Sequence, residues 1–556
     1  MLSDIEIAQN APIKHIKEIA ASLNISNDDL EYYGKYKAKL PLKLIDQNKI
    51  SKNHLILVTA VTPTPAGEGK TTMTVGLVDG LNKIGEKAIA ILREPSLGPV
   101  FGLKGGAAGG GYAQVIPMED INLHFTGDFS AIEKANNLLA ALIDHNLQNN
   151  KRSLQIDPRS ITWKRVIDLN DRALRHTVIG LGGNQNGMVR EDGFNITPAS
   201  EIMAILCMSQ SLDDLKQRLG NIFIGQTYAG TPVFARDLNA VGAMTILLKD
   251  AIKPNLVQTL EGNPAILHGG PFASIAQGTN SILATKMGLS LADYVVTEAG
   301  FGADLGAEKF FDIKCRTSGL KPIAVVMVTT IRAMRHHGGA KKANLDQPSA
   351  AKVLKGCENL GKHLENMRHF GMKAIVAINR FPTDTAEEIA IVVDFCAKYD
   401  IKAIESTGFA EGGTGMVEIA EEVRNLVSKN ESSFSPLYDL DLPFEEKIKT
   451  IATKIYGADD VAYSVKAKMQ LKQIDELGFG KLPVCMAKTP KSLSDDERKI
   501  GRPKDFIITI REFEYAAGAG FVIPILGEIM RMPGLPNIPA AESMDIDESG
   551  KIVGLS

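Results

Sequence analysis

A glycine-rich stretch between an apolar run and a helical pattern constrains the fold of this chain more than any other feature. Residues 62–72 (TPTPAGEGKTT) follow the apolar run 55–61, which predicts a buried strand. Residues 73–84 then place apolar side chains at helical spacing. A strand, a glycine-rich turn and a helix that opens with Lys-Thr form the context of a phosphate-binding P-loop. The sequence therefore predicts an α/β protein that binds a nucleotide.

The residues of this loop suit a triphosphate. Gly67 and Gly69 let backbone N–H groups turn toward an anion, and the following helix adds its N-terminal dipole. We expect Lys70 to reach the β- and γ-phosphates and the Thr71 hydroxyl to ligate Mg²⁺. The predicted ATP-binding residues are Thr64, Pro65, Ala66, Gly67, Glu68, Gly69, Lys70 and Thr71.

One position of the loop departs from the usual pattern. Thr64 stands where the first glycine is expected, and Gly67 is additional, so the loop is a variant. The alternative is a glycine-rich turn whose lysine is only solvated. The strand pattern before the loop and the helix pattern after it favour the phosphate site.

The composition excludes several classes of function. The chain has 556 residues, of which 44% are hydrophobic and 23% charged, as expected for several globular domains. Its formal net charge of −3 argues against a nucleic-acid partner. No apolar run approaches the ~18 residues of a membrane span, and the N-terminus lacks a signal-peptide pattern. Five scattered cysteines fit a reducing cytoplasm and no zinc site.

Other predicted strands end in residues that suit ligand binding. In an open parallel sheet, ligands bind beyond the carboxyl ends of the strands. Arg93 follows the predicted strand 86–92 and is suited to a phosphate or carboxylate, although a surface ion pair with Glu94 is the alternative. Phe301 and Phe381 follow the strands 293–298 and 373–378, and both could border a slot for a flat ring. Phe409 is a third candidate, and simple core packing is the alternative for all three.

The histidines carry weaker signals. His268 ends a strand and turns through glycines, so it is either a substrate contact or a hydrogen-bonded structural residue. Residues 334–339 (MRHHGG) are predicted to form a flexible basic loop. His336 and His337 are adjacent and their side chains diverge, so we do not expect a metal site there.

Three long motifs carry a resemblance to a known family. They are residues 92–102 (LREPSLGPVFG), 104–114 (KGGAAGGGYAQ) and 117–128 (PMEDINLHFTGD). They resemble formate–tetrahydrofolate ligase, also called 10-formyltetrahydrofolate synthetase, in its single-function bacterial type. Shorter matching segments continue in the same order to residues 532–536 (MPGLP), so the resemblance covers nearly the whole chain.

The resemblance implies a reaction and a set of roles. ATP would drive the joining of formate to tetrahydrofolate in one-carbon metabolism, through formyl phosphate, giving 10-formyltetrahydrofolate, ADP and phosphate. Lys70 would neutralise the transferred phosphoryl group, and Arg93 would bind formate and formyl phosphate. The resemblance also implies a homotetramer, a folate substrate with a polyglutamate tail, and activation by K⁺ or NH₄⁺. The implied folate positions are Phe301, Gly302, Phe381, Pro382 and Phe409, and the implied cation positions are Glu94, Ser96 and Asp128.

Two positions depart from the family pattern. Phe409 stands in place of a tryptophan and Ser130 in place of a histidine. Phenylalanine keeps a face for stacking but offers less area and no indole N–H, so we expect weaker folate binding with activity retained. Ser130 is assigned no catalytic role.

The fold expected from these patterns is α/β. A P-loop NTPase-like, mostly parallel sheet flanked by helices would be joined by smaller α/β lobes. The nucleotide-binding domain would comprise residues 1–130 plus about 270–360, an accessory lobe 131–270, and C-terminal lobes 361–556 that contribute to the folate site. The competing functions are another P-loop ATP-dependent ligase or carboxylase of the dethiobiotin-synthetase type, and a nucleotide switch that binds a protein partner.

Overall fold

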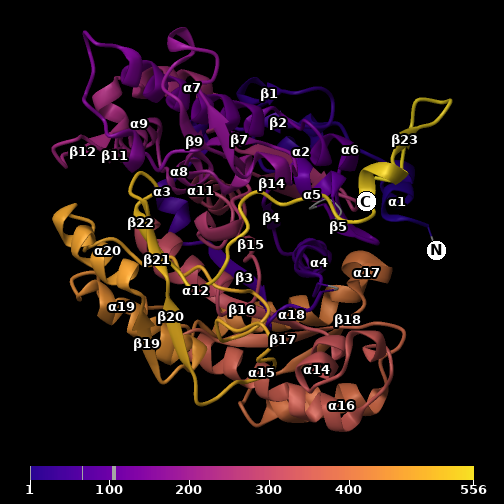
Figure 1. Cartoon of the computed structure of the whole chain (residues 1–556). Helices are drawn as coiled ribbons and strands as arrows, with labels where there is room; N and C mark the ends of the chain where they lie inside the picture. Colours follow the sequence, from indigo (N-terminus) through magenta and orange to yellow (C-terminus); the bar gives the residue numbers. More distant parts are fainter. Residues whose placement is uncertain (1, 66, 103–107, 556) are drawn as a thin grey trace.

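A large twisted sheet forms the centre of the molecule. The computed structural model describes residues 2–65, 67–102 and 108–555. Among these residues, twelve strands form one sheet in the order β1-β2-β13-β14-β4-β15-β3-β16-β17-β18, with β6 paired to β13 and β5 paired to β6 (Figure 1). Their bounds are β1 (Glu31–Tyr32), β2 (Ala38–Lys39), β3 (His54–Ala60), β4 (Ala88–Leu92), β5 (Gly109–Gly110), β6 (Ala113–Ile116), β13 (Asn255–Thr259), β14 (Pro264–Leu267), β15 (Tyr294–Glu298), β16 (Pro322–Thr329), β17 (Ala374–Asn379) and β18 (Ala403–Ser406).

Most of this sheet is parallel. All pairings from β14 through β4, β15, β3, β16 and β17 to β18 are parallel. The pairings of β13 with β14, β2 and β6 are antiparallel. The carboxyl ends of the seven parallel strands therefore lie on one edge of the sheet. The predicted α/β class with a mostly parallel sheet is confirmed.

Helices cover both faces of the sheet because its strands are apolar on both sides. Along β3, Leu55 and Leu57 pack into one buried cluster, whereas Ile56 and Val58 pack into another. The first cluster includes α2 (Ile16–Ser22), α11 (Ile282–Leu291), α14 (Ile331–His337) and α15 (Ala350–His369). The second includes α4 (Lys70–Lys83) and α18 (Val417–Lys429).

A third buried cluster belongs to a lobe on the β14 side of the sheet. It is built from α7 (Asp128–Gln148), α8 (Glu201–Met208), α9 (Leu212–Gly220) and α10 (Val241–Leu248). The hairpin of β21 (Glu512–Ala516) and β22 (Phe521–Ile525) packs into the same cluster. Residues near the C-terminus therefore complete a lobe that begins with residue 128.

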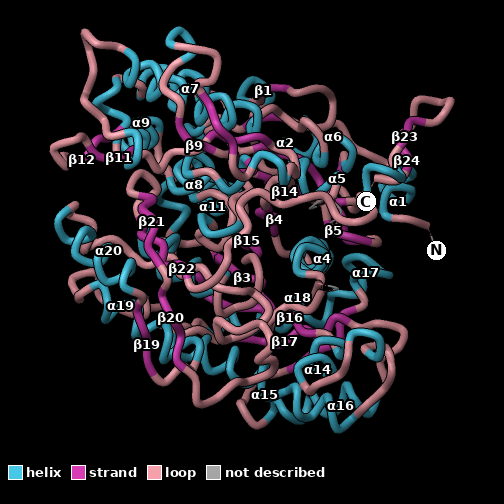
Figure 2. Tube along the Cα trace, in the orientation of Figure 1, coloured by secondary structure: helices cyan, strands magenta, loops and turns pink. Residues whose placement is uncertain are grey.

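Two further segments follow the central sheet in the chain. One contains α19 (Phe444–Ile451), α20 (Val465–Glu476) and the parallel pair of β19 (Asp460–Tyr463) and β20 (Ile507–Ile510). The last forms the hairpin of β23 (Asp545–Ile546) and β24 (Ile552–Val553), beside α1 (Asp4–Asn10) in Figure 2. The Gln9 side chain donates a hydrogen bond to the Ile552 carbonyl at 2.9 Å, so the two ends of the chain meet.

The predicted domain boundaries at 130, 270 and 361 stay predictions. The central sheet takes strands from each of the three predicted units, since β13 and β14 come from 131–270 and β17 and β18 from 361–556. Among the described residues, no helix is both long and apolar enough to cross a membrane.

The prediction of a flexible basic loop at residues 334–339 is wrong. Residues 331–337 form helix α14, and Arg335 and His337 are buried in it. The Arg335 guanidinium donates to both oxygens of Glu388 on α16 (Ala386–Ala397). The buried Arg335 guanidinium is therefore paired with a carboxylate, where the basic pattern had implied solvent.

Candidate active site

The glycine-rich loop connects β3 to the N-terminus of α4, as the sequence predicts. Gly67 and Gly69 both have a φ of +77°, a left-handed conformation that favours glycine. Gly69 also lacks room for a side chain, since a Cβ there would lie 2.5 Å from the amide nitrogen of Asn379. That amide donates a hydrogen bond to the Glu68 carbonyl at 3.2 Å. Ala66 lies outside the described residues.

Hydrogen bonds to the Glu68 side chain stabilise the loop. Its Oε1 accepts hydrogen bonds from the Thr64 backbone N–H and hydroxyl, both at 2.9 Å. Its Oε2 accepts from the hydroxyl of Thr330, which follows β16, at 2.7 Å. Glu68 and Thr64 are both buried, whereas Pro65 is exposed. Glu68 and Thr64 therefore set the shape of the loop from inside it.

Glu298 links the first turn of α4 to Arg93. Lys70 and Thr71 open α4 and both are partly buried. The Thr71 hydroxyl donates to Glu298 Oε2 at 2.8 Å, and Arg93 Nη2 lies 3.5 Å from Glu298 Oε1. Glu298 is 2% exposed and is the last residue of β15, which neighbours both β3 and β4. Glu298 was not among the predicted site residues, although its position at the carboxyl end of a strand is a signal readable in the sequence.

The predicted ring-binding residues follow strands on the same edge of the sheet. Phe301 follows β15, Phe381 follows β17, and Phe409 lies in α17 (Gly408–Glu411) after β18. Phe301 has a φ of +56°, which is uncommon for a residue with a side chain and is typical of strained functional loops. The Arg332 guanidinium lies 4.4 Å from the Phe381 ring centroid. Phe409 is 42% exposed, so its ring is accessible to a ligand.

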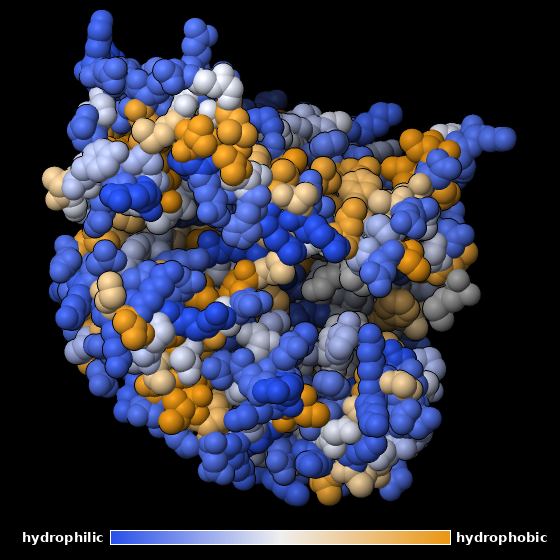
Figure 3. Space-filling view, in the orientation of Figure 1, coloured by the Kyte–Doolittle hydropathy of each residue, from blue (hydrophilic) through white to orange (hydrophobic). Residues whose placement is uncertain are grey.

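The loop that carries Phe301 also touches the glycine-rich loop. A Cβ at Gly302 would lie 3.2 Å from the Thr62 Cα, and the Ala303 N–H donates to the Ala60 carbonyl at 2.8 Å. The space-filling view shows that this face of the molecule is mainly hydrophilic, with scattered apolar side chains (Figure 3). The glycine-rich loop, the N-terminus of α4 and an accessible aromatic residue therefore share one edge of the sheet.

The family model for formate–tetrahydrofolate ligase matches residues 2–556. The chain belongs to the formate–tetrahydrofolate ligase family. It is a ligase of folate metabolism, and the substrates of this family are formate, ATP and tetrahydrofolate. The resemblance carried by the three long motifs is confirmed over the whole matched range.

The residues that resemble the ligase family's cation site fall into two clusters. Glu94 and Asp128 are both buried, and the Asn255 amide donates to each of them, at 2.8 and 2.9 Å. The Lys39 ammonium lies 2.7 Å from an Asp128 carboxylate oxygen. Ser96 instead donates to Asp168, at 2.6 Å. The structure therefore brings Glu94 and Asp128 together and directs the Ser96 hydroxyl elsewhere.

The electrostatic environment of Glu94 combines two features that suit a bound cation with one positive charge already present. Burial, and next the charge of Asp128, raise the pKa of Glu94 well above its usual value. The Lys39 ammonium is paired with Asp128, and its nearby charge only partly opposes the rise in the pKa of Glu94. A second positive charge would favour the ionised form of Glu94. Among the described residues, no group of three or more His, Cys, Asp or Glu side chains is arranged to hold a metal ion.

His268 is held as a structural residue. Its Nδ1 lies 2.6 Å from the Ser281 hydroxyl and its Nε2 lies 2.7 Å from the Ala251 carbonyl. It is fully buried, and this burial lowers its pKa to about 4. Both ring nitrogens are occupied by protein partners, which favours the structural alternative over a substrate contact.

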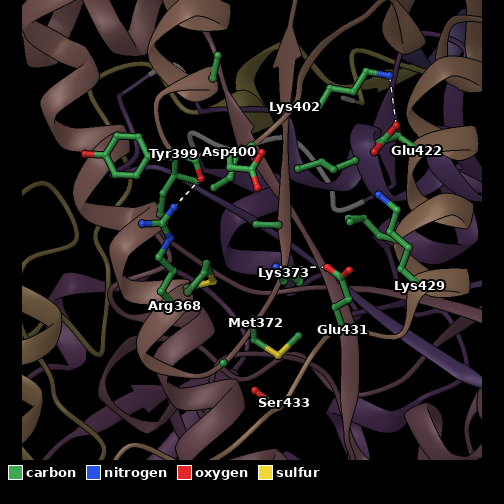
Figure 4. Close-up of a pocket in the computed structure, with 18 residues that line it drawn as sticks. Arg368, Met372, Lys373, Tyr399, Asp400, Lys402, Glu422, Lys429, Glu431 and Ser433 are labelled. Atoms are coloured by element: carbon green, nitrogen blue, oxygen red, sulfur yellow. Dashed lines mark hydrogen bonds and ion pairs between the residues drawn. The ribbon is translucent and has the colours of Figure 1, made fainter.

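A cavity of about 630 Å³ lies away from this site. Its lining includes Lys373 and Lys402, which directly precede β17 and β18, so it lies at the edge of the sheet opposite to the glycine-rich loop. Figure 4 shows the labelled side chains that line it. Lys402 pairs with Glu422 at 3.2 Å and Lys373 with Glu431 at 3.3 Å along its walls. These pairs neutralise much of the lining charge, and the cavity contains none of the predicted site residues.

Proposed function

We propose that this ligase joins formate to tetrahydrofolate through formyl phosphate, releasing ADP and phosphate. A free carboxylate is a poor acyl donor because an oxide would have to leave. Transfer of the γ-phosphoryl group to formate creates a phosphate leaving group, and the N10 amine of tetrahydrofolate can then attack the formyl carbon. The link from Thr71 through Glu298 to Arg93 carries this proposal, because it sets a carboxylate-binding guanidinium beside a helix N-terminus suited to phosphates.

The roles of the charged residues follow from this chemistry. Lys70 would neutralise the transferred phosphoryl group, and Arg93 would bind formate and then formyl phosphate. The Arg93 Nε is buried with no hydrogen-bond partner among the described residues, so the guanidinium retains donor capacity for a ligand. Thr71 would hold Mg²⁺, and the adjacent Glu298 carboxylate supplies a second oxygen donor that suits this ion. The ion would supply charge neutralisation of the phosphates.

The loop residues after β3 would bind the nucleotide, and the aromatic residues would bind the folate. Thr64, Pro65, Gly67, Glu68 and Gly69 would shape the phosphate site, and Ala66 is part of the same proposal. The pterin and aminobenzoyl rings of tetrahydrofolate would stack on residues of the accessible edge, namely Phe301, Gly302, Phe381, Pro382 and Phe409. Ser130 is exposed in the first turn of α7, and we assign it no role.

We also propose a monovalent cation, K⁺ or NH₄⁺, near Glu94 and Asp128. The placement of two buried carboxyl groups on one Asn255 amide supports this proposal, and the Lys39 ammonium beside Asp128 already supplies part of the positive charge. Ser96 would have to turn from Asp168 to contribute its hydroxyl. A homotetramer, a cytoplasmic location, a role in one-carbon metabolism and use of folate polyglutamates complete the proposal. The five cysteines are all buried and free, which suits a reducing compartment.

The test is ADP release from the purified enzyme with Mg-ATP, formate and tetrahydrofolate, each omitted in turn. We expect ADP only with all three present, and 10-formyltetrahydrofolate in equal amount. Lys70→Ala should lower kcat by roughly 10²–10³-fold, whereas Lys83→Ala at the other end of α4 should not. Release of ADP without formate or folate, or full activity of Lys70→Ala, would contradict the proposal.

A further inference from the structure

Thr62, where the chain leaves β3 for the glycine-rich loop, is held by side chains of two distant helices. Its N–H donates to His363 Nε2 at 2.9 Å, and its carbonyl lies 2.7 Å from His337 Nε2. Its hydroxyl lies 3.0 Å from His363 Nε2 and accepts from the Asn359 amide at 3.0 Å. Every polar group of Thr62 therefore has a partner on α14 or α15, and all four residues are buried.

These contacts assign the protons on both imidazoles. His363 Nε2 must be unprotonated to accept the Thr62 N–H. His337 Nε2 must be protonated to donate to the Thr62 carbonyl, while its Nδ1 accepts the Gly501 N–H at 3.3 Å. Both rings are therefore neutral, in agreement with burial that lowers the pKa of His337 to about 3 and of His363 to about 4. The cluster keeps one charge state at neutral pH.

The same cluster reaches the C-terminal part of the chain. The Asn359 amide also donates to the Gly501 carbonyl, at 2.8 Å, so Gly501 is bound at both its N–H and its carbonyl. The next residue, Arg502, makes two hydrogen bonds of 2.8 Å to Glu365 on α15. Asn359 and His363 lie one helical turn apart on one face of α15. Helix α15 therefore connects Thr62 to residues 501 and 502.

We propose that His337, Asn359 and His363 are positioning residues for the nucleotide. They hold the start of the glycine-rich loop so that its N–H groups are arranged for a triphosphate before it binds. The physical reason is entropic: ordering a flexible residue costs about 1–2 kcal/mol, and a loop arranged during folding does not incur this cost again on binding. This inference rests on the proposed nucleotide site, and it adds Gly501 to the elements coupled to that site.

The first test compares two replacements of His363. His363→Ala leaves the Thr62 N–H buried without an acceptor, whereas His363→Gln keeps an acceptor near the position of Nε2. We expect His363→Ala to raise the Kd for Mg-ATP, measured by calorimetry, by about tenfold or more. His363→Gln should restore most of the affinity, and the exposed His369→Ala on the same helix should match the wild type. The KM for tetrahydrofolate should change less than the KM for ATP in each variant.

The second test separates the two contacts of His337. His337→Gln keeps a donor toward Thr62, and His337→Asn keeps an acceptor toward Gly501. We expect His337→Asn to bind Mg-ATP more weakly than His337→Gln, with similar melting temperatures. Equal ATP affinities for this pair, or wild-type affinity in a folded His363→Ala, would overturn the inference. If the wild type itself binds no Mg-ATP, the proposed function fails instead, so the two failures are distinguishable.

Discussion

The Thr71 hydroxyl donates a hydrogen bond of 2.8 Å to the Glu298 carboxylate, which joins the first turn of α4 to the end of the neighbouring strand β15. The other oxygen of the same carboxylate faces Arg93 at 3.5 Å. One buried side chain thus spans the two groups that the proposed reaction needs together, a phosphate site and a carboxylate site. The relative placement of these groups depends on Glu298.

Replacing Glu298 with glutamine should impair catalysis while the fold is retained. The amide keeps one hydrogen-bond acceptor but loses the charge that orients Arg93 and assists Mg²⁺. We expect kcat to fall by about 10²-fold, measured as ADP release, with little change in melting temperature. Asp293→Asn, in an exposed residue just before the same strand, is the matched control. A Glu298→Gln enzyme with kcat within twofold of the wild type would refute the role of this carboxylate.

The two glycines of the loop should respond differently to a methyl group. Both have a φ of +77°, so alanine at either position adds a similar backbone strain of about 1 kcal/mol. Among the residues that the structure describes, a Cβ at Gly69 would lie 2.5 Å from the Asn379 amide nitrogen, whereas a Cβ at Gly67 would have no atom within 4 Å. We expect Gly69→Ala to raise the KM for ATP far more than Gly67→Ala. Equal effects in steady-state assays would show that backbone strain alone decides the outcome.

Removing the lysine from the buried Lys39–Asp128 pair should cost much more stability than removing it from a partly exposed pair of equal length. Lys39–Asp128 and Lys37–Asp120 are both 2.7 Å, but the first pair is buried and the second is partly exposed. Lys39→Met leaves a buried carboxylate without its counter-ion, which costs about 3–5 kcal/mol. Lys37→Met should cost roughly 1 kcal/mol or less. Urea unfolding of both variants measures the difference, and similar losses would contradict this argument.

The Glu201 carboxyl group should make the folded protein less stable as the pH rises. Its side chain is partly buried, and desolvation raises its pKa to about 8, although Oε1 accepts hydrogen bonds from the Gly518 and Ala519 N–H groups of the β21–β22 turn. Because the pKa of this carboxyl group is higher in the folded than in the unfolded protein, its protonated form stabilises the fold. This stabilisation is fully present below the unfolded pKa of about 4.5 and is lost as the pH rises through 8. Glu201→Gln is neutral at every pH and keeps the acceptor.

The melting temperature of Glu201→Gln relative to the wild type should therefore increase between pH 6 and pH 9. Thermal unfolding at several pH values in this range measures the effect. The exposed Glu476→Gln serves as the control, because it removes a carboxylate that is not buried. A pH-independent difference between Glu201→Gln and the wild type would show that this carboxyl group does not titrate in the folded protein near pH 8.

Sequence patterns predicted the local elements because local physics produces them. The apolar run before the loop became β3, the glycines that needed positive φ lie in the loop, and Lys70 and Thr71 open α4. The predicted strands around 86–92 and 373–378 are β4 and β17. Spacing and backbone preference act within a few residues, so they are readable without a structure. Long motifs also predicted the family, which the family model confirms.

The basic stretch 334–339 shows where such reasoning fails. Paired histidines, arginine and glycines indicated a solvated loop, yet Arg335 is fully buried against Glu388, which lies 53 positions later. Only a partner from a distant segment makes the burial of a guanidinium favourable. The sequence around residue 335 contains no sign of that partner.

By itself, therefore, the sequence determined the strand–loop–helix unit, the α/β class and the family of this protein. Only the tertiary structure decided which side chains complete the site. Glu298 reaches Thr71 across 227 positions, and His363 reaches Thr62 across 301. The first contact exists because parallel strands from different parts of the chain place their carboxyl ends on one edge of the sheet, and the second because α15 packs in the same buried cluster as β3. Local patterns predict each strand separately, whereas the order of the strands in the sheet is set by long-range packing.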